Sequence, residues 1–327
     1  MKIVVFDGYT LNPGDISWDN LVSLSDEVNI YDRTSLSLIA ERGKDADAVF
    51  TNKTILMKEQ LDQLPNLKYI GLLSTGINVV DLEETAKRGI FVTNVPDYST
   101  NAVAQMTFSL LLELCNHVME HSESVHRGEW SSNKDFCYWN LPLIELSGKT
   151  LGIIGYGKIG RAVAKIAVAF GMNILISGRT QPKEIENNQW VTLDNLLSES
   201  DVVTVHCPLN NDTKELINAV SLGKMKPTAF LINTSRGPII NEKELSEALN
   251  CGIIAGAALD VLSVEPPDIN NPLINAKNCL ITPHISWASK AARERLMSIA
   301  ANNFKSYING NPINIVNKLP VLPIRNL

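Results

Sequence analysis

Short apolar runs recur along the chain and alternate with polar stretches that are compatible with helices. A first series of predicted strands covers residues 2–6, 46–51, 67–73 and 90–93. A second series begins at Leu151 and continues with residues 173–177, 201–205, 229–233, 253–259 and 279–282. This rhythm is typical of βαβ units, so we expect an α/β protein with two doubly wound parallel-sheet domains.

The segments between and after these strands predict the domain boundary and two long helices. The first domain ends near residues 94–99, where Pro96 stands among turn formers. One helix is predicted over residues 101–126 and a closing helix over residues 286–309. Residues 130–146 have no regular period but contain many apolar side chains. They either form a subunit interface or pack on their own domain.

The composition narrows the possible partners and compartments. The chain has 327 residues, of which 45% are hydrophobic and 20% charged, and its net charge is −6 with no basic cluster. We therefore expect a small-molecule partner and neither nucleic acid nor a membrane. The N-terminal apolar run is too short for a signal peptide, and no run approaches the roughly twenty apolar residues that span a bilayer, which favours a cytoplasmic protein. The five scattered cysteines fit neither a disulfide framework nor a metal site, and we expect them to be reduced.

A glycine-rich turn carries the strongest functional signal. Gly155, Gly157 and Gly160 lie between an apolar strand and an amphipathic helix, in the segment 149–171. Gly155 permits a tight turn, Gly157 lets the backbone approach a pyrophosphate, and Gly160 lets helix and strand pack closely. The helix N-terminus then faces the negative charge. This context favours a dinucleotide site over a glycine turn without a ligand.

The end of the next strand bears on the choice of cofactor. Ser177 is followed by Gly178, Arg179 and Thr180. NAD sites usually place an acid here to bind the ribose, whereas an arginine accommodates the 2′-phosphate of NADP. Ser177 or Thr180 can add a hydroxyl donor. We therefore expect NADP(H), and the alternative is NAD(H) with a solvated Arg179.

Three further segments each place one reactive side chain just after a predicted strand. These are Arg236 in LINTSRG, Glu265 in ALDVLSVEPP and His284 in ITPHISWAS. Side chains at the carboxyl ends of parallel strands can converge on one crevice. There, Arg236 can bind a carboxylate, Glu265 can hold a charged imidazole, and His284 can exchange a proton. Taken singly, each of these three residues also fits a structural role as a core, capping or solvated residue. His117 and His121 have helical spacing but lack a third ligand, so we expect no metal.

These motifs resemble the D-isomer-specific 2-hydroxyacid dehydrogenase family over essentially the whole chain. The resemblance rests on GYGKIG, HCPLNNDT, NTSRG, the EPP after Asp260, and TPHISWA, which follow the family's order and approximate spacing. It implies a Rossmann dinucleotide-binding domain, residues 99–289, inserted into a flavodoxin-like substrate domain formed by residues 1–98 and 290–327. Two segments, HISWASKAARERL and FCYWNLPLIELSGKT, look most like bacterial glycerate dehydrogenases or hydroxypyruvate reductases.

The resemblance also implies roles for substrate-site residues. Arg236 is similar to the arginine that orients the substrate, His284 to the acid/base and Glu265 to its partner carboxylate. One loop is similar to the family's substrate-carboxylate loop, which binds through backbone amides; it contains Ser74, Thr75 and Gly76.

Further resemblances concern the cofactor. Lys158 and Ile159 match the glycine turn. The loop around the adenosine is matched by Cys207, Pro208 and Thr213, and positions near the nicotinamide by Thr234 and Asp260, with Ser235 as a further cofactor contact. Gly178 departs from the family's NAD-type aspartate, and Gly-Arg at this position resembles the NADPH-using glyoxylate/hydroxypyruvate reductases.

We therefore predict a reductase of small 2-keto acids, hydroxypyruvate and glyoxylate, that prefers NADPH and forms a homodimer. Within the enzyme class the alternative is a D-lactate dehydrogenase. Outside it, the alternative is a nucleotide-sensing, corepressor-like binding protein of the same fold. Activity of the purified protein with keto acids distinguishes these possibilities.

Overall fold

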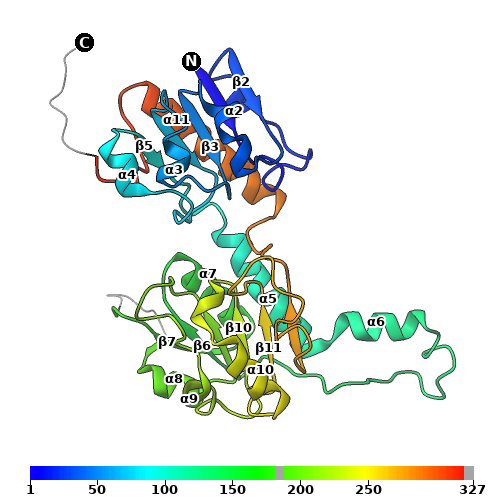
Figure 1. Ribbon diagram of the computed structural model, residues 1–327. Helices are drawn as coiled ribbons and strands as arrows, with labels where there is room; N and C mark the ends of the chain where they lie inside the picture. Colours follow the sequence, from blue (N-terminus) through cyan, green and yellow to red (C-terminus); the bar gives the residue numbers. More distant parts are fainter. Residues whose placement is uncertain (182–187, 320–327) are drawn as a thin grey trace. The chain divides into compact units, whose positions relative to one another are not determined.

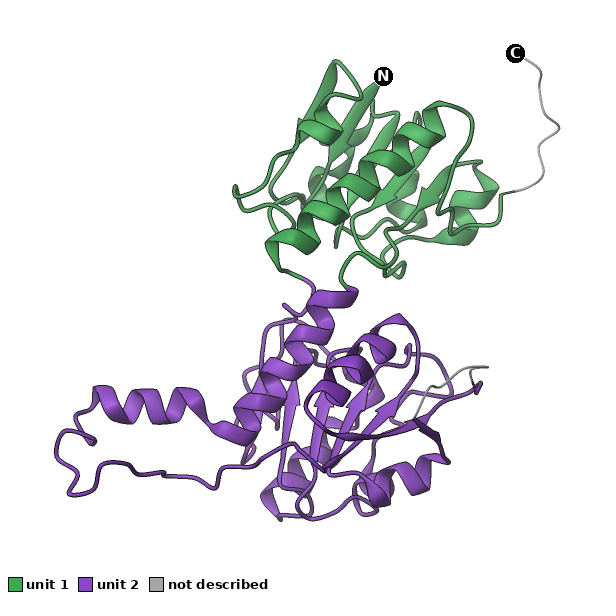
Figure 2. Ribbon diagram, turned by 180° about the vertical axis from the view of Figure 1, so that it is seen from behind, with its two compact units in different colours: residues 1–99, 288–327 green, residues 100–287 purple. Residues whose placement is uncertain are grey.

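The computed structural model describes residues 1–181 and 188–319, and the chain divides into two compact units (Figure 1). Unit 1 combines residues 1–99 with the chain from residue 288 onward, and unit 2 comprises residues 100–287 (Figure 2). Each unit is built around a parallel sheet, which confirms the predicted fold class. No helix in the described ranges is both long and apolar enough to cross a membrane.

The sheet of unit 1 has the strand order β2-β1-β3-β4-β5, which is the flavodoxin-like order. Its strands are β1 (Lys2–Val5), β2 (Glu27–Ile30), β3 (Ala48–Thr51), β4 (Tyr69–Leu72) and β5 (Phe91–Thr93). Its helices are α1 (Asp19–Val22), α2 (Ile39–Gly43), α3 (Lys58–Leu61), α4 (Leu82–Lys87) and α11 (Lys290–Ile308), with a 3-10 turn at Leu36–Leu38. The strands β3 and β4 are buried along their whole length. The edge strand β2 is half-exposed and has few apolar residues, so the sequence pattern did not predict it.

Helix α11 completes the core of unit 1. It packs on β4 and α1, although nearly two hundred residues separate it from the rest of the unit. The ring of Phe304 lies 5.5 Å from that of Phe50 and 4.8 Å from that of Tyr69, measured between centroids. Because all three side chains are fully buried, the two ends of the chain share one hydrophobic core.

Among the described residues, the sheet of unit 2 has the order β12-β11-β10-β9-β6-β7-β8. Its strands are β6 (Thr150–Ile154), β7 (Asn173–Ser177), β8 (Gln189–Trp190), β9 (Val202–Val205), β10 (Phe230–Asn233), β11 (Gly256–Leu259) and β12 (Cys279–Ile281). Its helices are α5 (Thr100–Asn116), α6 (Val118–His126), α7 (Lys158–Ala169), α8 (Leu193–Glu199), α9 (Ala219–Leu222) and α10 (Glu242–Asn250), with a 3-10 turn at Gly237–Ile239. The strand order reverses between β6 and β9, where doubly wound sheets bind nucleotides.

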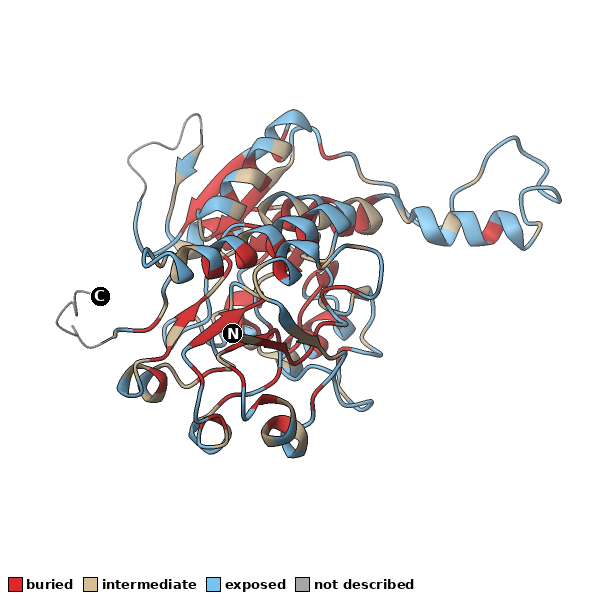
Figure 3. Ribbon diagram, turned by 90° about the horizontal axis from the view of Figure 1, so that it is seen from above, coloured by how far each residue is buried: buried red, intermediate tan, exposed pale blue. Residues whose placement is uncertain are grey.

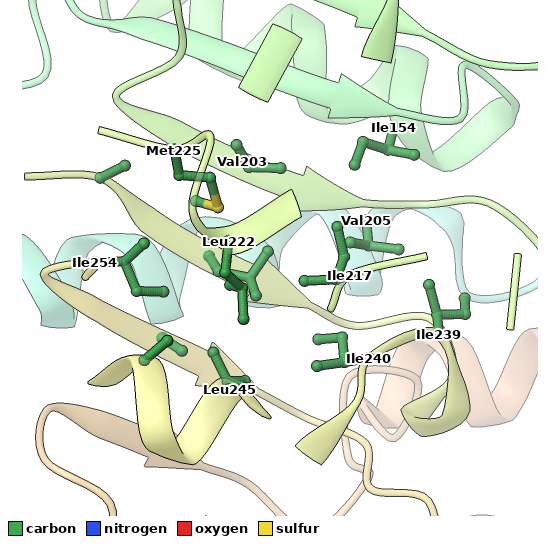
Figure 4. Packing of buried hydrophobic residues seen from close by; sticks show 14 of the residues in the cluster. Ile154, Val203, Val205, Ile217, Leu222, Met225, Ile239, Ile240, Leu245 and Ile254 are labelled. Atoms are coloured by element: carbon green, nitrogen blue, oxygen red, sulfur yellow. The ribbon is translucent and has the colours of Figure 1, made fainter. Parts of the chain in front are cut away.

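Side chains from successive strand positions supply hydrophobic cores on both faces of this sheet. On one face, Val203, Val205 and Ile154 pack with residues of α9 and α10 (Figure 4). On the other face, Ile153 and Ile232 pack with residues of α5 and α7. Because helices cover both faces, the carboxyl edge of the sheet is the natural place for a ligand.

The long helix predicted over residues 101–126 is interrupted, so this prediction was wrong in one respect. Helix α5 ends at Asn116, and α6 starts only after His117, whose φ is +48°. This left-handed conformation breaks the helix, and His117 is therefore not on a helical surface. Helix α6 and residues 127–149 form an arm that extends from unit 2 (Figures 1 and 2). Most of this arm is exposed (Figure 3).

Candidate active site

The glycine turn between β6 and α7 has the geometry of a phosphate cradle. Gly155 has a φ of +95°, and a Cβ there would lie 2.6 Å from the Cys207 nitrogen. A Cβ on Gly160 would lie 2.3 Å from the Gly155 oxygen. Around Gly157, by contrast, no atom lies within 4 Å of a Cβ position, and this residue provides no side-chain cap for α7. The residues present therefore fit a pyrophosphate at the N-terminus of α7.

Loops from the neighbouring strands pack around this turn. The Gly155 amide donates to the Ser177 carbonyl at 2.8 Å, and the Ser235 hydroxyl donates to the Cys207 carbonyl at 2.6 Å. The structure thus brings Gly155 close to Ser177 at the end of β7, and Cys207 close to Ser235, whereas Arg179 and Thr180 are exposed. Burial raises the pKa of the Cys207 thiol to about 11, so this side chain stays neutral.

Two predicted cofactor residues use their hydroxyl groups for internal contacts. Thr213 donates to the Pro208 carbonyl at 2.7 Å and shapes the loop after β9. Thr234 is buried, and its hydroxyl lies 3.3 Å from that of Thr107 on α5. In this structure, both side chains therefore serve to fix loop geometry.

The segment after β7 is open to solvent. Gly178, Arg179 and Thr180 are all exposed. A Cβ added to Gly178 would make an ordinary contact of 3.4 Å with the Trp190 ring, so a larger residue fits there. The glycine at this position is therefore not required by packing.

Glu265 and His284 form a direct pair. The Nδ1 atom of His284 lies 2.6 Å from Oε2 of Glu265, and both side chains are about one-third exposed, at 28% and 34%. Because a carboxylate only accepts hydrogen bonds, Nδ1 carries a proton and Nε2 is left for other partners. The Leu262 amide donates to Oε1 of Glu265 at 3.1 Å, so the carboxylate is itself held in place.

The buried carboxylate of Asp260 holds the loop that bears His284. It accepts hydrogen bonds from the Thr282 hydroxyl at 2.6 Å, the Ile285 amide at 2.9 Å and the Ser286 amide at 2.8 Å. The His284 amide also donates to the Asp260 carbonyl at 2.8 Å. These contacts maintain His284 at a φ of +54°, a conformation that costs energy for a residue with a side chain. Asp260 is therefore a positioning residue for the imidazole.

A similar arrangement holds Arg236. Asn233, which is fully buried at the end of β10, donates to the Arg236 carbonyl and accepts from the Ser235 amide, both at 2.9 Å. The Arg236 guanidinium is exposed and donates to the Ser235 carbonyl at 2.7 Å. Sequence reasoning missed Asn233, although an asparagine at the end of a buried strand is the usual signal for such a turn.

The loop predicted to bind the substrate carboxylate lies in unit 1. It follows β4 and is held by the Ser74 hydroxyl, which donates to the Gly76 carbonyl at 2.7 Å. The Thr75 hydroxyl donates to the Val95 carbonyl, also at 2.7 Å. Both hydroxyl groups are engaged within the unit, which leaves the backbone amides of this loop as its donors for a ligand.

Comparisons with known proteins identify several relatives of this chain. Residues 108–286 match the family described as "D-isomer specific 2-hydroxyacid dehydrogenase, NAD binding domain". A hydroxypyruvate reductase from Blautia hydrogenotrophica is 51% identical over 97% of this chain and 100% of its own. A glycerate dehydrogenase from Methylorubrum extorquens is 40% identical over 85% of this chain and 88% of its own. An NADPH-dependent glyoxylate/hydroxypyruvate reductase from Sinorhizobium meliloti has a similar structure, with a TM-score of 0.83, 28% identity and coverage of 97% and 98%.

Proposed function

Because the chain belongs to the D-isomer-specific 2-hydroxyacid dehydrogenases, we propose that it reduces hydroxypyruvate and glyoxylate to D-glycerate and glycolate. The observation that carries the proposal is the Glu265–His284 pair, which leaves one imidazole nitrogen available next to the candidate cofactor site. The names of the relatives point to the same substrates. The acid/base pair favours turnover over a purely sensing role.

The proposed chemistry divides between the cofactor and the chain. The dihydronicotinamide, when bound, supplies a hydride to C2 of the keto acid. Arg236 binds the carboxylate of the keto acid through its guanidinium group. His284 transfers its Nε2 proton to the carbonyl oxygen, so that the alcohol forms without an alkoxide left in the site. Glu265 accepts a hydrogen bond from Nδ1–H and so holds the imidazole ring in place for that transfer.

We infer a preference for NADPH from the end of β7. Arg179 is exposed beside Gly178, and no carboxylate stands at that position to repel a 2′-phosphate. A guanidinium contributes a charge-assisted hydrogen bond to a phosphate, worth about 1.5 to 3 kcal/mol. Even the lower value corresponds to roughly tenfold discrimination.

Steady-state kinetics test both parts of this proposal. The enzyme is assayed with hydroxypyruvate, glyoxylate and pyruvate, each with NADPH and NADH. We expect kcat/KM to be highest for hydroxypyruvate or glyoxylate with NADPH. A Gly178→Asp, Arg179→Ala double variant should lose or reverse the cofactor preference, while Lys243→Ala, an exposed lysine on α10, should retain it. A preference of the wild type for NADH would refute the cofactor part alone.

We also propose that the arm mediates a homodimer. Leu146 and Ile144 pack on unit 2, but the rest of the apolar arm does not. The exposed apolar side chains include Val118, Met119, Trp130, Phe136, Trp139 and Leu143, and Phe136 is 88% exposed. Many large apolar side chains exposed along one segment are typical of a subunit interface. Sedimentation should give a dimer for the wild type and a monomer for Phe136→Asp with Leu143→Asp, and a wild-type monomer would refute this part.

A further inference from the structure

The carboxyl edge of the unit 1 sheet contains a cavity of about 390 Å³. Asp7 and Thr10 line it from the segment after β1, residues 32–36 from the segment after β2, and residues 53–55 from the segment after β3. In the order β2-β1-β3, the chain leaves β1 and β3 toward opposite sides, which opens a crevice at this point of a doubly wound sheet. The cavity thus lies where such sheets bind ligands.

One lysine in this cavity has an unusually well-fixed backbone. The buried Asp7 carboxylate accepts hydrogen bonds from three successive amides: Asn52 at 2.8 Å, Lys53 at 2.5 Å and Thr54 at 3.0 Å. The Thr51 hydroxyl donates to the Thr54 carbonyl at 3.1 Å and closes the same turn. The Lys53 side chain itself is exposed, and no described residue forms an ion pair with it. Asp32 and Arg33 also line the cavity, and Lys53 is the lysine among its lining residues.

The position of Lys53 relates the cavity to the loop of Ser74, Thr75 and Gly76. The strands β3 and β4 are paired, and the Leu73 amide donates to the Thr51 carbonyl at 2.8 Å at their carboxyl ends. The segment after β3 consequently lies between the segment after β1 and the segment after β4. Lys53 therefore lies between the cavity and the loop of residues 74–76, which is predicted to bind the substrate carboxylate.

We infer that Lys53 is a specificity-determining residue that recognises an oxygen on C3 of the substrate; this rests on the proposed function. A keto acid whose carboxylate is bound by the amides at residues 74–76 directs its remaining carbons toward the cavity. The Lys53 ammonium then donates a hydrogen bond to a hydroxyl or anionic group on C3. An apolar C3 leaves the ammonium without this partner, so such acids bind less well.

Hydroxypyruvate and pyruvate form a matched pair of probes because they differ only by the C3 hydroxyl group. For the wild-type enzyme we expect kcat/KM to favour hydroxypyruvate. In Lys53→Met, the ratio of the two kcat/KM values should fall by about 10- to 100-fold, chiefly through KM for hydroxypyruvate, since a hydrogen bond to a charged donor is lost. Lys53→Arg should retain part of the ratio. Lys44→Met, an exposed lysine of the same unit outside the cavity, should leave it unchanged.

The ratio is measured on one preparation, so partial misfolding of a variant does not alter it. An unchanged ratio in Lys53→Met, with an active wild type, would overturn this inference and leave the proposed function intact. An equal loss for both acids would overturn it as well, because Lys53 would then bind the common carboxylate. A wild type that reduces neither acid would refute the proposed function and this inference with it.

Discussion

The carboxyl edges of the two sheets use backbone amides in opposite ways. In unit 2, the turn after β6 keeps open space around Gly157, and this N-cap residue of α7 makes no side-chain hydrogen bond to the helix amides. In unit 1, the chain places its own carboxylate, Asp7, on the amides of residues 52–54. One edge leaves an anion site for a ligand, whereas the other fills a comparable site with a side chain. Two sheets with similar windings can therefore differ entirely in what they bind.

This difference assigns separate tasks to the two edges. The edge of unit 2 presents backbone amides and the side chains Arg236, Glu265 and His284 at the ends of successive strands. The edge of unit 1 presents a filled turn that displays Lys53. We therefore expect cofactor binding and proton transfer to depend on unit 2, and discrimination between acids to depend on unit 1.

The largest effect should follow from removing the proton donor at the edge of unit 2. His284→Ala should lower kcat by about 100-fold or more, because general acid catalysis is lost. The Kd for NADPH, measured by fluorescence titration, should stay within twofold of the wild type. His126→Ala, an exposed histidine at the end of α6, is the control. A nearly normal kcat for His284→Ala across neutral pH would contradict the mechanism.

Two glycine variants in the turn after β6 distinguish an effect on cofactor binding from an effect on folding stability. Gly157→Ala meets no protein atom, so its melting temperature should match the wild type while Kd for NADPH rises by about tenfold or more. Gly160→Ala places a Cβ 2.3 Å from a carbonyl oxygen and should lower the melting temperature as well. Normal NADPH affinity in Gly157→Ala would show that the cradle does not bind the pyrophosphate.

Removing the Asp7 carboxylate from the carboxyl edge of the unit 1 sheet should lower the free energy of unfolding. Burial raises the pKa of Asp7, and the three amides that donate to it oppose this shift. Asp7→Asn replaces one accepting oxygen with an amide group and should destabilise the protein by about 1 to 3 kcal/mol in urea unfolding. The same variant should reduce the preference for hydroxypyruvate over pyruvate, since Lys53 loses its fixed backbone. Asp45→Asn, at an exposed position, should change neither quantity.

The smallest effect should be on the loss of folding stability at acid pH, and it involves His206, which follows β9 in unit 2. His206 is half-buried, its Nε2 lies 2.9 Å from the Thr204 hydroxyl, and burial lowers its pKa to about 3. As pH falls below the ordinary value of 6.5, the unfolded chain takes up a proton that the folded chain does not, so stability is lost between pH 6.5 and 3. His206→Gln should lose less stability than the wild type between pH 7 and 5. Equal losses in both proteins would contradict this.

Much of the fold follows from local patterns. Strands such as β3, β9 and β10 are buried throughout and read as apolar runs, so alternation of strands and helices predicts them directly. The edge strand β8 is short and partly exposed, and its pattern does not stand out. The break at His117 was missed because a left-handed residue inside a helical pattern is normally glycine or asparagine.

Those parts of the candidate site that lie within one short sequence motif were predictable from the sequence. The glycine turn and the reactive side chains after β10, β11 and β12 are of this kind, and the 51% identical relative confirms the family that they indicated. Contacts between distant segments carry no such signal. Asp7 reaches amides about 45 residues along the chain, and only the folded sheet brings them together. Roles of this type require the tertiary structure.

The contribution of α11 to unit 1 has a consequence for the order of events during synthesis. Phe304 belongs to the same core as Phe50 and Tyr69, but it leaves the ribosome only after all of unit 2. Translation proceeds at about 5 to 20 residues per second, so roughly 10 to 40 s pass between synthesis of the first 99 residues and synthesis of α11. Unit 2, whose residues are continuous in the chain, can acquire its complete core during that interval. We therefore expect the nascent protein to pass through a stage in which the inserted unit is folded and the unit that encloses it in sequence is not.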